Sequence, residues 1–164
     1  MNENEIICGF CGYNSDTKFP LPDISTKHIN KGGLSFDYPG YYDVSDVPVN
    51  NEAYKSRVGL SKDGNCEIYV VEYWHSTFDN NAKRNPYLIK EYLKNYNYTN
   101  ITENGKFDYC YNANIDSKYG KLNAVILFNF NYSNVIMIAC YKFSDLNYNF
   151  VNDMRIINDS VRPI

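Results

Sequence analysis

The chain has 164 residues, of which 44 % are hydrophobic and 21 % charged, and its formal net charge is −3. This length suits one domain with a substantial core, and the composition is that of an ordinary globular protein. Nucleic-acid-binding proteins usually present a basic surface, so the acidic balance argues against a nucleic-acid partner.

The cysteines and the N-terminus indicate a cytoplasmic protein. Five cysteines is an odd count, and only Cys8 and Cys11 are close in sequence, which is not the pattern of a disulfide framework. The N-terminus is acidic and has no apolar run of signal-peptide length. No stretch reaches the ~18 consecutive apolar residues of a membrane span, so we expect no membrane partner.

Residues 1–13 contain a Cys-x-x-Cys motif formed by Cys8 and Cys11. This spacing is that of half a zinc ribbon, because two such thiolates can hold one tetrahedral ion. A structural zinc site needs four ligands, and the chain has no second pair. His28 could add a third ligand, or a second copy of the chain could complete the site in a zinc-bridged homodimer. The alternatives are a degenerate ribbon that binds no metal and a redox pair, although no helix follows the motif.

Residues 14–32 are rich in proline, glycine and polar residues, so we predict a flexible linker in which His28 is solvated. A single α+β domain is expected over residues 33–164. It opens with alternating apolar residues in Leu34–Tyr38 and Tyr42–Val44 around Pro39-Gly40, which predicts a hairpin. Strands at Tyr54–Leu60 and Cys66–His75 follow.

A helix is predicted next, because Asn85 suits the N-cap and Pro86 the first helical position. Its apolar stripe consists of Leu88, Ile89, Tyr92, Leu93 and Tyr96. Tyr98–Thr102 and Phe107–Ile115 are predicted to pair as strands. Alternation places Cys110 on the polar, exposed face of the second of these strands, where its thiol would be accessible.

The runs 122–130 and 135–143 flank a polar break and predict a second hairpin. Both runs are apolar at nearly every position, so we place this hairpin at the centre of the sheet with a layer on each face, and Cys140 in the core. A last helix should begin at Ser144 or Asp145. The predicted fold is α+β, an antiparallel sheet of about 6–8 strands with helices packed on it.

Two phrases carry a resemblance to a known family. The domain opens with Phe36-Asp37-Tyr38-Pro39 and closes with a helix in which Met154, Ile157 and Ser160 recur at helical spacing. Over roughly residues 33–162 the sequence resembles the PsbP-like family, although Tyr41-Tyr42 stand where members usually have a tryptophan. The resemblance implies an α/β/α sandwich. Members are mostly accessory binding proteins, and some carry a zinc ribbon in front of the domain.

Glu72, Trp74, His75 and Asp79 form the most enzyme-like cluster, since an imidazole near a carboxylate can act as a general base. Alternation puts Glu72 and His75 on opposite faces of their strand, which disfavours a concerted pair. We therefore expect a non-catalytic binding or adaptor domain with a protein or small-ligand partner. The alternatives are an enzyme that uses His75 and nearby acids, and a zinc-bridged assembly module.

Overall fold

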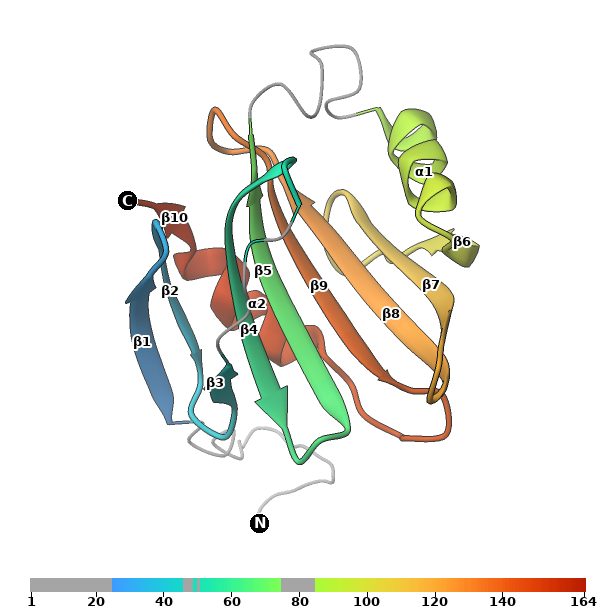
Figure 1. The fold of residues 1–164 in the computed structure, drawn as a ribbon, viewed down its shortest axis with the longest axis horizontal. Helices are drawn as coiled ribbons and strands as arrows, with labels where there is room; N and C mark the ends of the chain where they lie inside the picture. The colour runs from blue at the N-terminus through green and yellow to red at the C-terminus, as the bar shows by residue number, and fades with distance from the viewer. Residues whose placement is uncertain (1–24, 46–48, 50, 75–84) are drawn as a thin grey trace, which may run out of the picture.

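A computed structural model describes residues 25–45, 49, 51–74 and 85–164. Within these ranges the chain forms a seven-stranded sheet, a three-stranded sheet and two α-helices (Figure 1). All strand pairs in both sheets are antiparallel, so the predicted α+β class is confirmed. No helix of the described ranges is long and apolar enough to cross a membrane.

The large sheet is built around the predicted central hairpin. Its strands, in spatial order, are β3 (Asp43–Ser45), β4 (Tyr54–Lys62), β5 (Cys66–Tyr73), β9 (Ile136–Phe143), β8 (Gly120–Asn129), β7 (Cys110–Ser117) and β6 (Thr99–Glu103). Strands β8 and β9 pair from Leu122↔Phe143 to Asn129↔Ile136. They are apolar on both faces because each face is covered by a helix, as the uninterrupted apolar runs predicted.

The small sheet corrects two predictions. Its strands are β1 (Thr26–Lys31), β2 (Leu34–Pro39) and β10 (Arg162–Pro163). Strand β1 occupies part of the expected linker, because Gly32 and Gly33 take positive φ angles of 62° and 91° and turn the chain back onto β2. The predicted hairpin between Leu34–Tyr38 and Tyr42–Val44 is wrong: β2 pairs with β1 and β10, whereas β3 pairs with β4.

Helix α1 (Pro86–Asn95) covers one face of the large sheet. The Asn85 side chain accepts hydrogen bonds from the backbone N–H groups of Tyr87 and Leu88, which confirms the predicted cap. Ile89 and Leu93 are buried against the sheet, in a core that also contains these residues: Val71, Tyr73, Tyr111, Ala124, Ile126, Phe128, Met137 and Ala139.

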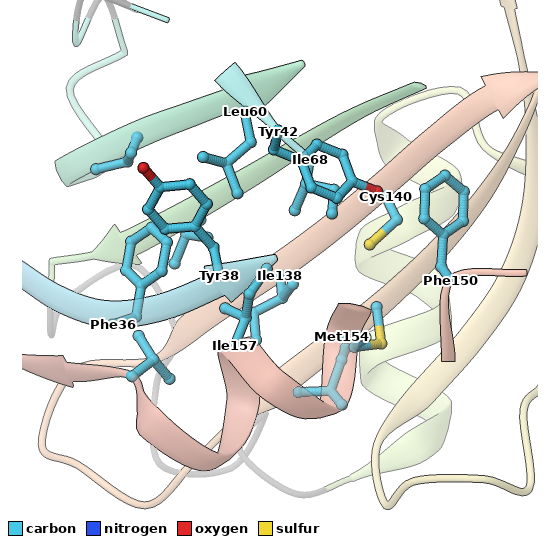
Figure 2. Packing of buried hydrophobic residues seen from close by; sticks show 14 of the residues in the cluster. Phe36, Tyr38, Tyr42, Leu60, Ile68, Ile138, Cys140, Phe150, Met154 and Ile157 are labelled. Atoms are coloured by element: carbon cyan, nitrogen blue, oxygen red, sulfur yellow. The ribbon is translucent and has the colours of Figure 1, made fainter. Parts of the chain in front are cut away.

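Helix α2 (Val151–Ser160) covers the opposite face, together with β2. Figure 2 shows its Met154 and Ile157 among Phe36, Ile138 and other buried side chains of this core. The predicted start at Ser144 or Asp145 is wrong, because polar contacts hold the preceding segment in an irregular conformation. Lys142 donates a hydrogen bond to the Leu146 carbonyl oxygen at 2.6 Å, and the Asn149 side chain accepts one from the Val151 N–H group at 2.8 Å.

Candidate functional site

A cavity of about 710 Å³ opens on the α2 face of the large sheet, at the N-terminal end of α2. Asn112 of β7, Val125 of β8 and Lys142 of β9 contribute the sheet side of its lining. The lining comes from the turn between β6 and β7, from the sheet, and from the segment that leads into α2. The lining residues are Glu103–Phe107, Asn112, Val125, Lys142, Asn147–Val151 and Met154. A volume of this size suits a small-molecule ligand.

The β6–β7 turn forms one wall and is held by a network around Asn104. The Asn104 N–H group donates to the Cys110 carbonyl oxygen at 2.8 Å, and its side-chain amide donates to the Asn112 Oδ1 atom at 3.1 Å. Its own Oδ1 atom accepts from the Lys106 N–H group at 3.0 Å. The Arg155 guanidinium of α2 lies 5.3 Å from the Phe107 ring centroid. These contacts fix the wall against the helix.

The opposite wall is the segment from Asn147 to Phe150. Its Tyr148 hydroxyl donates a hydrogen bond to the Asp153 Oδ2 atom at 2.6 Å, and its ring packs edge-to-face on Phe150 with centroids 5.2 Å apart. Lys142 anchors the start of the segment through its bond to Leu146. Both walls are therefore positioned before any ligand arrives, which limits the ordering that binding would require.

The chemistry of the lining is cationic and rich in amides. Lys106 and Lys142 contribute ammonium groups, while the Glu103 carboxylate is 3.5 Å from the Lys90 ammonium and is partly neutralised by it. Amide groups come from Asn104, Asn112, Asn147 and Asn149. Apolar atoms of Phe107, Val125, Tyr148, Phe150, Val151 and Met154 complete the lining. Among these described lining residues there is no histidine or cysteine that could act as a base or nucleophile.

Next to the cavity, the buried carboxylate of Asp153 accepts three tyrosine hydroxyls. Tyr41 donates to its Oδ1 atom, and Tyr42 and Tyr148 donate to its Oδ2 atom, each at 2.6 Å. Burial, followed by the bond to Asp153, raises the pKa of Tyr41 to about 12 and the pKa of Tyr42 further. The hydroxyls therefore keep their protons at neutral pH and stay donors to the carboxylate.

The residues predicted to carry metal or catalytic chemistry are only partly described. Cys8, Cys11, His75 and Asp79 lie outside the described residues. Within those residues no group of three or more potential ligands could hold a metal ion.

Of the two described members of the enzyme-like cluster, Glu72 is held in a buried polar network, whereas Trp74 lies at the surface. Glu72 is buried and accepts hydrogen bonds from Asn134 at 2.8 Å and Ser56 at 3.5 Å, with the Lys55 ammonium 3.7 Å away. Trp74 is 48 % exposed.

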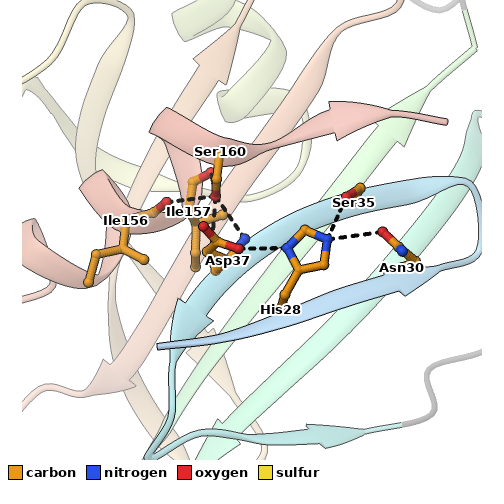
Figure 3. Close-up of polar contacts among 7 residues, drawn as sticks. All are labelled: His28, Asn30, Ser35, Asp37, Ile156, Ile157 and Ser160. Atoms are coloured by element: carbon orange, nitrogen blue, oxygen red, sulfur yellow. Dashed lines mark hydrogen bonds and ion pairs between the residues drawn. The ribbon is translucent and has the colours of Figure 1, made fainter. Parts of the chain in front are cut away.

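The sequence predicted a solvated His28, but the structure gives its ring three side-chain partners. Its Nδ1 atom lies 2.6 Å from Asp37 Oδ1, and its Nε2 atom lies 2.9 Å from Ser35 Oγ and 3.1 Å from Asn30 Oδ1 (Figure 3). This order of side chains is that of a Ser-His-Asp triad. Ser35, however, has no exposed surface and lies on β2, the strand between β1 and β10 in the small sheet. A substrate cannot reach its hydroxyl, so the group serves as a brace between β1 and β2.

Figure 3 also shows that the two phrases of the family resemblance meet in space. The Asp37 N–H group donates a hydrogen bond to Ser160 Oγ at 2.8 Å, and Ser160 donates to the Ile156 carbonyl oxygen at 2.8 Å. The serine thereby joins β2 to the last turn of α2.

The prediction of an accessible Cys110 thiol is wrong. Alternation along β7 holds, because Tyr111 faces the α1 side and Cys110 the α2 side, but both faces are covered at this position. Cys110 is 2 % exposed, its Sγ atom lies 4.0 Å from Met154 Sδ, and burial raises its pKa to about 12. A thiol of this kind is unreactive. Cys140 is buried in the same core, as predicted.

The sequence matches no protein-family model and no curated protein. Among solved structures, the chain is similar to the solution structure of cyanobacterial PsbP (CyanoP) from Synechocystis sp. PCC 6803, with a TM-score of 0.48 and 11 % identity. The match covers 92 % of this chain and 100 % of that one. A match at this level carries no argument about function.

Proposed function

We propose that this protein is a non-catalytic binding domain that takes a small, hydroxyl-rich anion in the cavity at the N-terminal end of α2. The observation that carries the proposal is the cavity lining. It combines two lysines and four asparagines with an apolar and aromatic surface. Ligand sites of small molecules are typically concave and mostly apolar, with a few converging polar groups that set specificity.

The charge of the lining favours an anion. Of the three charged residues that line the cavity, two are lysines, and the carboxylate of the third, Glu103, is already paired with Lys90. Asparagine amides both donate and accept hydrogen bonds, so they match hydroxyl groups, which do the same. Tyr148 and Phe107 contribute aromatic atoms to the lining, against which the C–H groups of a sugar ring can pack. A sugar acid combines these features.

The described lining residues include no histidine or cysteine, and their one carboxylate, that of Glu103, is paired with Lys90, which supports binding rather than catalysis. The thiols of the described cysteines are free and buried, which supports a reducing compartment such as the cytoplasm.

The proposal is tested by titrating the full chain with galacturonate and with galactose, its neutral counterpart. The readout is the shift of the asparagine side-chain amide signals in ¹⁵N NMR spectra, with calorimetry for affinity. We expect galacturonate to bind more tightly than galactose and to move the signals of Asn104, Asn112 and Asn147. Lys106→Met should weaken galacturonate binding about tenfold, which corresponds to about 1.4 kcal/mol.

Lys121→Met is the matched control, because Lys121 is an exposed lysine of β8 that does not line the cavity. It removes the same charge and should leave the affinity for galacturonate unchanged. Equal losses of galacturonate affinity in both variants would show that the effect comes from net charge and not from the cavity. No amide shift at ligand concentrations of about 20 mM, well above a Kd of about 1 mM, would overturn the proposal.

A further inference from the structure

Two tyrosine rings beside the cavity hold the ammonium group of Lys62. The Lys62 Nζ atom lies 3.7 Å from the ring centroid of Tyr148 and 5.0 Å from that of Tyr41. A cation at these distances from an aromatic ring is attracted by the negative face of the ring. Aromatic cages bind quaternary ammonium groups through the same interaction. The chain therefore contains a cage that already holds a cation.

Asp153 prepares both rings for a cation. Their hydroxyls donate to opposite oxygens of its carboxylate at 2.6 Å, which fixes the orientation of both side chains. A hydrogen bond to an ionised acceptor is strong, and it shifts electron density toward the phenol ring, so that the ring face becomes more negative. Tyr42 holds the carboxylate from the core side, also at 2.6 Å. The cage is thus preorganised by a buried negative charge.

Lys62 is placed to leave this cage. It is the last residue of β4 and precedes a tight turn in which Asp63 and Gly64 take positive φ angles of 56° and 69°. The Lys62 ammonium is joined to the strand by a flexible side chain, and this side chain loses rotamer freedom when the ammonium is held. Tyr41 is 44 % exposed, so the cage is open to solvent.

We propose that Tyr41, Tyr148 and Asp153 form a binding site for a small quaternary ammonium compound, and that Lys62 is an internal ligand that this compound displaces. A primary ammonium is strongly hydrated and gives up hydrogen bonds to water when it meets a ring face. A quaternary ammonium has no N–H groups, and its methyl groups can contact both rings. It should therefore compete with Lys62, whose effective concentration at the cage is in the millimolar range.

The test compares choline with 3,3-dimethylbutan-1-ol, a neutral compound of the same shape, in calorimetric titrations of the full chain. Lys62→Met empties the cage and should tighten choline binding about tenfold. The control Lys118→Met removes another lysine from a tyrosine ring, since Lys118 Nζ lies 5.0 Å from the ring centroid of the exposed Tyr119. This control should bind choline as the wild type does. The neutral compound should not bind measurably.

Adding Tyr41→Leu to Lys62→Met should abolish choline binding, and circular dichroism would show whether this variant is folded. Because Tyr41 is half exposed, its loss should leave the core intact. If the variant with Tyr41→Leu does not fold, Tyr148→Phe is combined with Lys62→Met instead. Tyr148→Phe keeps the ring, loses the bond to Asp153 and should weaken choline binding. Three results would overturn the proposal: no gain in Lys62→Met, equal binding of the neutral compound, or binding that survives the loss of Tyr41 in a folded variant.

Discussion

Replacing Asp153 by alanine should lower the free energy of unfolding by about 2–4 kcal/mol. The carboxylate accepts three hydrogen bonds of 2.6 Å, and bonds to a charged group each contribute about 1.5–3 kcal/mol. The buried hydroxyl of Tyr42 would lose its partner, at a cost of about 1–3 kcal/mol, whereas the hydroxyl of the exposed Tyr41 can bind water. Asp153 also lies in the first turn of α2, where a negative charge contributes about 0.3–1 kcal/mol.

The sum of these terms is reduced because the wild type buries a charge, and its removal relieves several kcal/mol of desolvation. Asp153→Asn should lose about half as much as the alanine variant, because the amide oxygen still accepts hydrogen bonds. Urea denaturation followed by circular dichroism measures both changes, with an unchanged slope as evidence of an intact native state.

A double-mutant cycle with Tyr42→Phe isolates the central bond, for which we expect a coupling of about 1–3 kcal/mol. Tyr38→Phe is the matched control, because Tyr38 is a buried tyrosine of the same core and makes no side-chain hydrogen bond to the described residues. It should show no coupling to Asp153. A loss below about 0.5 kcal/mol in Asp153→Ala, within the range of ordinary surface changes, would refute the role assigned to the carboxylate.

Three further predictions concern the core, alkaline pH and the N-terminal motif. Ile138→Ala should destabilise the domain by about 2–5 kcal/mol, because it removes a fully buried side chain from the central strand; urea titration decides, and a loss below about 0.5 kcal/mol would place the sheet centre elsewhere. Burial and Asp153 raise the pKa of Tyr42 above its usual value of 10.0, so above pH 10 the unfolded chain loses a proton that the native state keeps. Stability should therefore fall as the pH rises, by at most about 1.4 kcal/mol per pH unit from this group, and Tyr42→Phe should show a flatter decline. If Cys8 and Cys11 hold zinc between two chains, the purified protein should contain one zinc per dimer, and a chelator should release both metal and dimer. Metal-free protein, or an unchanged mass in sizing chromatography after chelation, would contradict that prediction.

Local patterns were sufficient where each element is defined by its own residues. The Asn85-Pro86 pair and the apolar stripe of α1 need no distant partner to be recognised. The central β8–β9 hairpin is continuous in sequence, and its apolar runs showed that both faces are covered. The α+β class follows from the order of such elements.

Pairing and burial were decided by residues far apart in the chain. The sequence suggested that β2 would pair with the next strand, but a Gly32-Gly33 turn gives it the preceding polar strand instead. Cys110 follows the predicted alternation, yet it is buried because Met154, 44 residues away, packs on it. A period of two shows which residues share a face; it does not show whether that face is covered.

The sites proposed here depend most completely on the tertiary structure. The cavity is lined by residues from the β6–β7 turn, the sheet and the segment before α2, and the aromatic cage joins Tyr41, Lys62, Tyr148 and Asp153 from separate elements. No local pattern marks such residues, because asparagines and lysines are also common on solvated surfaces. Composition and periodicity determined which layers form, because the spacing of apolar residues along the chain decides which face of each helix or strand is buried. The site arises only where those layers end, because its side chains converge through contacts that the chain makes after it has folded.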